Sequence, residues 1–184
     1  KSSVIITTDK VYKIKGYKSY IEEDELGGYD PYSSSKVCSE IVANSYIKSF
    51  YNKNTSLKYV STARAGNVIG GGDYSKDRLI PDIFRAIENK KKLIIRNPNS
   101  IRPWQHVIEP SVGYLLLAQK NYQKKINALS NSWNFGPNFK NFKSVMYIVN
   151  KIEKYYKFKF SIIKKKAFHE TQTLKLNSEK SHKY

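Results

Sequence analysis

Short apolar runs alternate with helical segments along the 184-residue chain, and this alternation limits the possible folds more than any other feature. Val4–Thr7 is a β-branched run that predicts a buried parallel strand, and Leu57–Ala65 predicts a second strand. Between them, Ser33–Tyr51 predicts a helix with a serine-rich start that can cap it. Its apolar residues recur at helical spacing, namely Val37, Ile41, Val42, Tyr46 and Ile47.

The second half of the chain repeats this pattern. Pro81 opens a predicted helix that runs through Ile87, and a strand is expected at Leu93–Arg96. The other expected elements are a helix at Pro110–Lys120, a strand in the segment Ser132–Asn138, a helix at Lys143–Tyr156 and an edge strand at Phe158–Ile163. Strands that alternate with helices predict an α/β fold with a mainly parallel sheet.

The formal net charge of +18 raises the question of a nucleic-acid partner, because a basic protein can collect phosphates. The lysines are spread along the chain, however, with two short runs at Lys90–Lys92 and Lys164–Lys166. The sequence carries no zinc-finger spacing, no basic helix that continues into heptads and no RNA-recognition signature. We therefore interpret the charge as a solvated surface, with a few cations reserved for a small phosphorylated ligand, and expect no nucleic-acid partner.

Cysteine content and hydropathy narrow the setting of the protein. The single cysteine, Cys38, cannot form an internal disulfide, which fits a reducing cytoplasm, and its helical segment predicts a small buried residue. No apolar stretch approaches the length of a membrane span, so we expect no membrane partner, and we also expect no bound metal. The chain begins with Lys1 and its first residues already predict a strand, so we expect a fragment of a longer protein.

Polar or glycine-rich segments follow two of the predicted strands. Thr8, Asp9 and Lys10 come after the first strand, and the segment GNVIGGGD (66–73) follows the second as a predicted loop. Ligands of parallel sheets bind beyond the carboxyl ends of the strands. The two segments therefore predict one shared site.

Tyr32 and Lys36 form a second candidate constellation. They are four residues apart at the start of a predicted helix, so both side chains lie on one face. A lysine ammonium near a phenol favours the phenolate, which makes the tyrosine a usable base. In a chain with 15 tyrosines this spacing also arises between surface residues. Its position after a strand that ends in Thr8 and Asp9 makes the combination far more specific.

These residues in this order resemble the extended branch of the short-chain dehydrogenase/reductase superfamily, which acts on nucleotide sugars. Longer segments are similar to the CDP-glucose 4,6-dehydratase family, namely DELGGYDPYSSSKVCSE, ARAGNVIGGGDYSKDRLIPDIFRA, IIRNPNSIRPWQHVIEPSVGYLLLA, WNFGP and HETQTLKL. The resemblance runs from about Ile6 to Lys175, which is nearly the entire chain.

The resemblance implies the C-terminal part of a Rossmann-type doubly wound parallel sheet and part of a small α/β substrate-binding domain. It places the second half of the Rossmann-type domain at residues 1–75 and the substrate-binding domain mainly at 76–184, with about 104–135 returning to the first. Both ends of the parent protein would be missing. No G-x-x-G-x-x-G occurs in the sequence, so we expect the isolated chain neither to bind NAD tightly nor to turn over.

The resemblance also implies roles for single residues. Tyr32 would take the proton from the sugar 4-hydroxyl while hydride leaves carbon 4 for NAD, and Lys36 would hold the nicotinamide ribose. Thr8 would hydrogen-bond the same region of the sugar. Asp9 would protonate the departing 6-hydroxyl, and the substrate CDP-glucose would become CDP-4-keto-6-deoxyglucose.

Lys10 distinguishes this chain from the related dTDP-glucose dehydratases, in which the resemblance places a glutamate as the base for the carbon-5 proton. A lysine can act as that base only when it is neutral. Alternatively, Lys10 orients the substrate while another group or water removes the proton. The sequence leaves both roles open.

Several further residues are candidate substrate contacts through the same resemblance. Arginine is suited to such contacts because its guanidinium fork matches phosphate oxygens. The candidates are Asn67, Arg78, Arg96, Arg102 and His106, of which Arg102 has the strongest counterpart against the diphosphate. His169 and Glu170 are interpreted as structural.

Three alternatives accompany this interpretation. The nearest is another nucleotide-sugar dehydratase or an epimerase of the same branch, but an epimerase has no use for an acid such as Asp9. The second, from a different class, is a basic protein that binds nucleic acid or anionic surfaces through its lysines. A pseudoenzyme is the third, and the presence of Thr8, Asp9, Tyr32 and Lys36 argues against it. Relatives commonly pair through the helix that carries the Tyr–Lys pair, which implies a homodimer or larger homo-oligomer.

Overall fold

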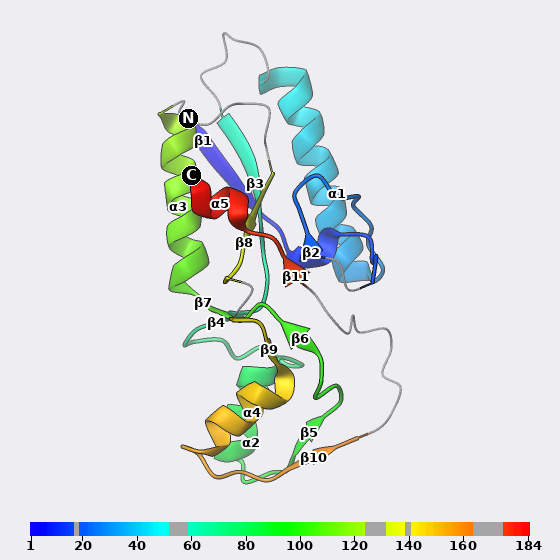
Figure 1. Cartoon of the computed structure of the whole chain (residues 1–184), viewed down its shortest axis with the longest axis vertical. Helices are drawn as coiled ribbons and strands as arrows, with labels where there is room; N and C mark the ends of the chain where they lie inside the picture. Colours follow the sequence, from blue (N-terminus) through cyan, green and yellow to red (C-terminus); the bar gives the residue numbers. More distant parts are fainter. Residues whose placement is uncertain (17–18, 52–58, 124–131, 139–140, 164–174) are drawn as a thin grey trace.

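The core of the chain is a parallel sheet of three strands. The computed structural model describes residues 1–16, 19–51, 59–123, 132–138, 141–163 and 175–184. Within them, β1 (Ser2–Ile6), β3 (Tyr59–Ala65) and β8 (Ser132–Phe135) pair in the order β1-β3-β8, with all strands parallel (Figure 1). Helices connect and flank these strands. The α/β fold with parallel strands that the sequence predicts is confirmed.

Two helices flank this sheet, α1 (Pro31–Tyr46) and α3 (Ile108–Tyr122), one on either side (Figure 1). Successive residues of a strand point to opposite faces, and β3 serves both helices in this way. On one face its side chains reach Glu40 of α1, and on the other Ala63 packs against Leu117 of α3. The sheet therefore has a polar contact with α1 and an apolar contact with α3.

The start and the buried face of α1 differ from the prediction. The cap is Asp30, whose Oδ1 accepts a hydrogen bond from the Ser33 amide at 3.0 Å, so the helix begins before the serines. The helix continues as a π-helical turn, η2 (Ile47–Tyr51). Several of the apolar side chains that mark its period are exposed, namely Ile41, Val42 and Tyr46. They are exposed because the face of α1 toward the sheet carries polar and small residues, such as Glu40 and Ala43.

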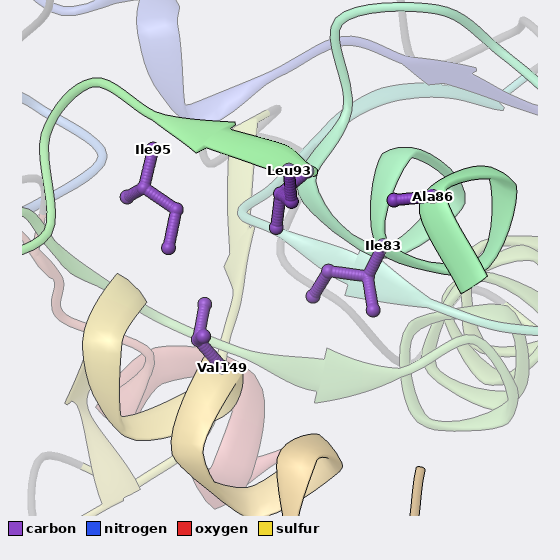
Figure 2. Packing of buried hydrophobic residues seen from close by; sticks show 5 residues of the cluster. All are labelled: Ile83, Ala86, Leu93, Ile95 and Val149. Atoms are coloured by element: carbon purple, nitrogen blue, oxygen red, sulfur yellow. The ribbon is translucent and has the colours of Figure 1, made fainter. Parts of the chain in front are cut away.

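A second apolar core lies away from the sheet (Figures 1 and 2). It joins the helices α2 (Leu79–Glu88) and α4 (Val145–Glu153) to the strands β5 (Leu93–Ile95) and β10 (Phe160–Ile162). The side chains of Ile83, Ala86, Leu93, Ile95 and Val149 form its centre. Among the described residues, these two strands pair in parallel with each other and do not pair with the main sheet. The apolar run at β5 therefore predicts a strand, but it does not predict which sheet that strand joins.

Short strand pairs link these two parts. β4 (Val68–Ile69) pairs in parallel with β7 (Gln105–His106), and β6 (Ile101–Arg102) pairs antiparallel with β9 (Lys143–Ser144). The remaining described elements are η1 (Asp9–Val11), β2 (Ser19–Tyr20), which pairs with β11 (Lys175–Leu176), and α5 (Glu179–Lys183). Two-residue strands of this kind leave no periodic pattern in a sequence.

Some local predictions are wrong. The first strand is only partly buried, because Ile6 is 53% exposed and none of the residues of β1 is fully buried. Cys38 is exposed on α1 rather than buried. The predicted loop 66–73 contains β4, and the helix expected from Lys143 begins at Val145, after the capping residue Ser144.

Other predictions fall outside the described residues or are not tested. Leu57, the run Lys164–Lys166, His169 and Glu170 lie outside the described residues. The division into 1–75 and 76–184 stays a prediction. None of the helices in the described part of the chain is both long enough and apolar enough to cross a membrane.

The second core provides a test of the fold. Ile83 is fully buried there, so we expect Ile83→Ala to lower the free energy of unfolding by about 2–5 kcal/mol. Ile94 is 56% exposed on the neighbouring strand, so Ile94→Ala should change it by no more than about 0.5 kcal/mol. Urea unfolding of the chain measures both, and equal effects would contradict this core.

Candidate active site

The residues that follow β1 form a tight turn at the end of the sheet. The amide of Thr7 donates to the Ala63 carbonyl at 2.8 Å, which continues the pairing of β1 with β3. Thr8 then caps the short helix η1, and its Oγ1 accepts a bond from the Lys10 amide at 3.4 Å. This geometry brings Asp9 into the interior, where it is 3% exposed.

Asp9 has the electrostatics of a proton donor. Its Oδ1 accepts a bond from Thr8 Oγ1 at 3.1 Å, whereas Oδ2 is buried without a hydrogen-bond partner among the described residues. Burial raises the pKa of the carboxyl from 3.8 to about 6, although the Thr8 hydrogen bond and the charges of Lys10 and Arg102 lower it. A carboxyl group with this pKa can hold and release a proton close to neutral pH.

The unpartnered oxygen of Asp9 lies beside a glycine that the sequence analysis gave no role. A Cβ at Gly66 would lie 3.1 Å from Asp9 Oδ2 and 2.3 Å from Cγ of Pro103. A side chain at this position would therefore collide with the segment that follows β6. The close approach of three segments, after β1, β3 and β6, is what buries Asp9.

Tyr32 and Lys36 lie at the start of α1, as predicted, with Lys10 beside them. The Nζ atoms of Lys36 and Lys10 are 6.0 and 5.9 Å from the centroid of the Tyr32 ring. Tyr32 itself is 49% exposed. Hydrogen bonds from Ser33 and the charge of Lys10 lower the pKa of Asp30, the cap of this helix. The structure thus brings the two predicted constellations together through Lys10.

A buried ion pair, which the sequence analysis missed, lies behind this site. Glu40 of α1 and Arg64 of β3 form two parallel bonds, Nε to Oε1 at 2.9 Å and Nη2 to Oε2 at 3.0 Å. The hydroxyls of Thr7 and Thr62 donate to the same carboxylate at 2.6 and 2.7 Å. One sequence signal was available, because Glu40 is four residues after Lys36 and so lies on the same helix face.

The hydrogen bonds keep this pair charged. Burial alone would raise the pKa of Glu40, but the hydrogen bonds and charge of Arg64, with the two threonine hydroxyls, lower it below its usual value. Arg64 Nη1 also donates to Tyr12 Oη at 2.9 Å, and Tyr12 Oη donates to Asn134 Oδ1 at 2.7 Å. The network therefore runs from α1 through β3 to β8.

Tyr114 of α3 is another residue near the site that the sequence analysis missed. Its ring packs edge-on against Phe135, with the ring centroids 5.2 Å apart. Burial and the nearby Asp9 carboxylate raise the pKa of Tyr114 to about 12. No sequence pattern marks this position, because Tyr114 stands among apolar residues of a predicted helix.

The predicted substrate contacts are spread over different environments. Arg102 is buried on β6, and its charge acts on Asp9. Asn67 precedes β4 and accepts a bond from the Gln105 amide through its carbonyl. The other three are exposed: Arg78 pairs with Asp73, Arg96 pairs with Asp77, and His106 Nδ1 accepts a bond from the Ile108 amide. Arg102 is thus a predicted substrate contact whose charge also lowers the pKa of Asp9.

The raised pKa of Asp9 makes a prediction about stability. Because the folded chain holds this proton more tightly than the unfolded chain, the free energy of unfolding should fall as the pH rises from about 4 to about 6, and then level off. A shift of about two pKa units corresponds to about 3 kcal/mol. Asp9→Asn should remove this fall and stabilise the chain at pH 7.

Urea unfolding across this pH range measures the effect. Asp77→Asn, which removes an exposed carboxylate, serves as the control, and its free energy of unfolding should depend on pH as that of the unchanged chain does. If Asp9→Asn leaves the pH dependence unchanged, Asp9 is not buried as a proton-binding group.

Comparisons with known proteins bear on the fold and the family of the chain. A CDP-glucose 4,6-dehydratase from Salmonella typhimurium (strain LT2) is 49% identical over 156 aligned residues, which cover 83% of this chain and 43% of that protein. A crystal structure of dTDP-glucose 4,6-dehydratase from Bacillus anthracis in complex with NAD superposes with a TM-score of 0.79 at 23% identity, over 98% of this chain and 54% of that one. UDP-glucuronic acid 4-epimerase from Bacillus cereus, in complex with UDP-glucuronic acid and NAD, gives 0.80 at 18% identity, over 99% and 54%.

These comparisons confirm the predicted Rossmann-type fold and the predicted family. The chain spans less than half of the Salmonella protein and just over half of each of these two solved structures. The profile of the NAD dependent epimerase/dehydratase family matches residues 2–132. Since this match covers more than half of the chain, the chain belongs to the NAD dependent epimerase/dehydratase family.

Proposed function

We propose that this chain is part of a nucleotide-sugar 4,6-dehydratase that acts on CDP-glucose with NAD. The observation that carries the proposal is the buried Asp9 carboxyl with a pKa of about 6, in the turn next to the Tyr32–Lys36 pair. A dehydratase of this kind must protonate a leaving hydroxyl, whereas an epimerase has no such step. The identity to the Salmonella CDP-glucose 4,6-dehydratase supports CDP-glucose as the substrate.

In this proposal the residues of the chain divide the proton transfers between them. Tyr32 accepts the proton of the sugar 4-hydroxyl, with Lys36 Nζ 6.0 Å from the centroid of its ring. The hydroxyl of Thr8 forms a hydrogen bond with the sugar near this 4-hydroxyl. Asp9 delivers its proton to the 6-oxygen as the carbon–oxygen bond breaks, so water leaves rather than hydroxide. Afterwards Asp9 is ionised, and the charge of Arg102 stabilises it.

The described residues fit the nicotinamide end of NAD. Lys36 and Tyr32 are at least partly exposed at the same edge of the sheet where the Asp9 Oδ2 atom lies buried and unpartnered. Lys36 would hold the nicotinamide ribose there. When bound, NAD would supply the acceptor for the hydride of carbon 4 and its return to carbon 6. The 184 residues contain no G-x-x-G-x-x-G, so the pyrophosphate contacts are assigned to other parts of the protein.

Lys10 and the cationic residues are assigned to the substrate. Lys10 is exposed beside Tyr32 and acts electrostatically on both Asp9 and Asp30. It can position the sugar there, or remove the carbon-5 proton in its neutral form. Arg102, Asn67, Arg78, Arg96 and His106 are the proposed contacts to the rest of the substrate, and of these Arg78 and Arg96 are exposed and ion-paired with Asp73 and Asp77.

The exposed apolar side chains of α1 support a homodimer or larger homo-oligomer of the parent protein. Ile41, Val42 and Tyr46 are each more than half exposed, and so is Phe50 in the π-helical turn that follows. A contiguous apolar helix face of this kind is typical of a protein interface. A cytoplasmic location is part of the same proposal, because the single cysteine suits a reducing compartment.

The function is tested with the complete protein that carries this chain. Incubation with CDP-glucose and NAD should give a 4-keto-6-deoxy product, measured by its absorbance at high pH. Asp9→Asn and Tyr32→Phe should each lower kcat by about 100-fold or more, because each removes a proton-transfer group. Lys91→Gln, in a surface lysine run, is the control and should leave kcat unchanged.

Two outcomes would contradict the proposal. Formation of an epimerised sugar without a keto product would identify an epimerase of the same family. A higher kcat/KM for dTDP-glucose or UDP-glucose than for CDP-glucose would agree with the proposed 4,6-dehydration but contradict CDP-glucose as the substrate.

A further inference from the structure

Three functional positions of α1 share one face of the helix. Tyr32, Lys36 and Glu40 follow each other at intervals of four residues, which places their side chains in a row. The row runs from the exposed start of the helix to its interior, because Tyr32 is 49% exposed and Glu40 fully buried. The catalytic pair and the buried carboxylate are therefore fixed to one rigid element.

The carboxylate of Glu40 has two donors on each oxygen. Oε1 accepts from Thr7 Oγ1 at 2.6 Å and from Arg64 Nε at 2.9 Å. Oε2 accepts from Thr62 Oγ1 at 2.7 Å and from Arg64 Nη2 at 3.0 Å. A carboxylate held by four donors has little freedom to move, so each donor is fixed relative to α1.

Thr7 connects this carboxylate to the catalytic turn. It is the residue before Thr8, and its amide makes the last bond of β1 with the Ala63 carbonyl. Its side chain therefore fixes the point at which the chain leaves the sheet for the turn that carries Asp9. Thr62 makes an equivalent bond from the middle of β3, and no catalytic residue follows it.

We propose that Glu40 is a positioning residue, which through Thr7 holds the Thr8–Asp9 turn in a fixed place relative to Tyr32 and Lys36. The base and the acid must act on atoms 4 and 6 of one sugar, so their separation decides the rate of the reaction. Glu40 touches neither substrate nor cofactor in this account. The inference rests on the proposed function for its catalytic consequence.

The alternative is a purely structural brace. Glu40 and Arg64 join α1 to β3 whether or not the protein is an enzyme, and replacing Glu40 would leave the Arg64 guanidinium buried without its partner. A Glu40 variant is therefore a poor test, because the unpaired buried Arg64 would destabilise the fold under either reading. The two threonines separate the readings, because each contributes one hydroxyl bond to the same carboxylate.

The experiment compares Thr7→Val with Thr62→Val in the complete protein. Valine keeps the shape of threonine and removes the hydroxyl, so both variants should lose a similar amount of thermal stability. Thr7→Val should lower kcat on the order of tenfold to 100-fold with KM changed less than about threefold, because the turn is released from α1. Thr62→Val should keep kcat within about threefold, and Thr7→Ser, which restores the hydroxyl, should recover most of the lost kcat.

A second readout does not depend on turnover. Asp9 is labelled with ¹³C in its carboxyl group, and its titration is followed by NMR in the same variants. Thr7→Val should move the midpoint of the Asp9 titration, whereas Thr62→Val should leave it in place. If the unchanged protein has no activity on CDP-glucose, the proposed function fails, and this titration alone decides the inference.

Equal effects of the two valine variants overturn the proposal. In an active protein the decisive quantity is kcat, and equal losses would show that the carboxylate is a structural brace. In an inactive protein, equal midpoints of the Asp9 titration in both variants would also show that the carboxylate is a structural brace. The proposal is also overturned if the Thr7→Val protein does not fold and the Thr7→Ser protein folds but is as slow as the Asp9→Asn protein.

Discussion

The buried pair of Glu40 and Arg64 is the interaction on which the rest of this structure depends. Two charges without water are costly to bury unless every lone pair and proton finds a partner. Here the partners come from five different segments: Thr7 after β1, Thr62 within β3, Tyr12 after η1, the Glu22 carbonyl after β2 and Ser132 at the start of β8. Satisfying the pair therefore requires these segments to come together, and this assembly fixes α1 and the start of the turn that carries Asp9. Fold and site share one set of hydrogen bonds.

The sequence predicts those parts of the structure that depend on a local pattern of residues. A β-branched run such as Val4–Thr7 and a helix with a period of 3.6 residues are visible without tertiary information, and so is an acid at the end of a strand. The pairing of Glu40 with Arg64 is not visible, because the spacing from Lys36 places Glu40 on a helix face but does not identify its partner on β3. The apolar period of α1 likewise does not show which face meets the sheet, and Ile41 and Val42 are exposed while Glu40 is buried. The burial of Asp9 depends on Gly66 and Pro103, which are distant in sequence.

The site explains why one protein family can host related reactions. In the proposed function, Tyr32 and Lys36 are assigned to a step that dehydratases and epimerases share, the removal of a proton from a sugar hydroxyl. The step that distinguishes a dehydratase, loss of a hydroxyl, is assigned to Asp9, one residue of a three-residue turn. Burial raises the pKa of Asp9 to about 6, and Thr8, Lys10 and Arg102 limit the rise. The specific chemistry therefore depends on how this one turn is held against the helix that carries the base.

The most direct test of this account follows one hydrogen atom through the reaction. The complete protein is given CDP-glucose that carries deuterium at carbon 4, and the product is examined by NMR. In a 4,6-dehydration the deuterium leaves carbon 4 and returns at carbon 6, so the account predicts a 4-keto-6-deoxy sugar with deuterium in its new methyl group. Deuterium that is found again at carbon 4, in a sugar with inverted configuration, would contradict the account and show an epimerase.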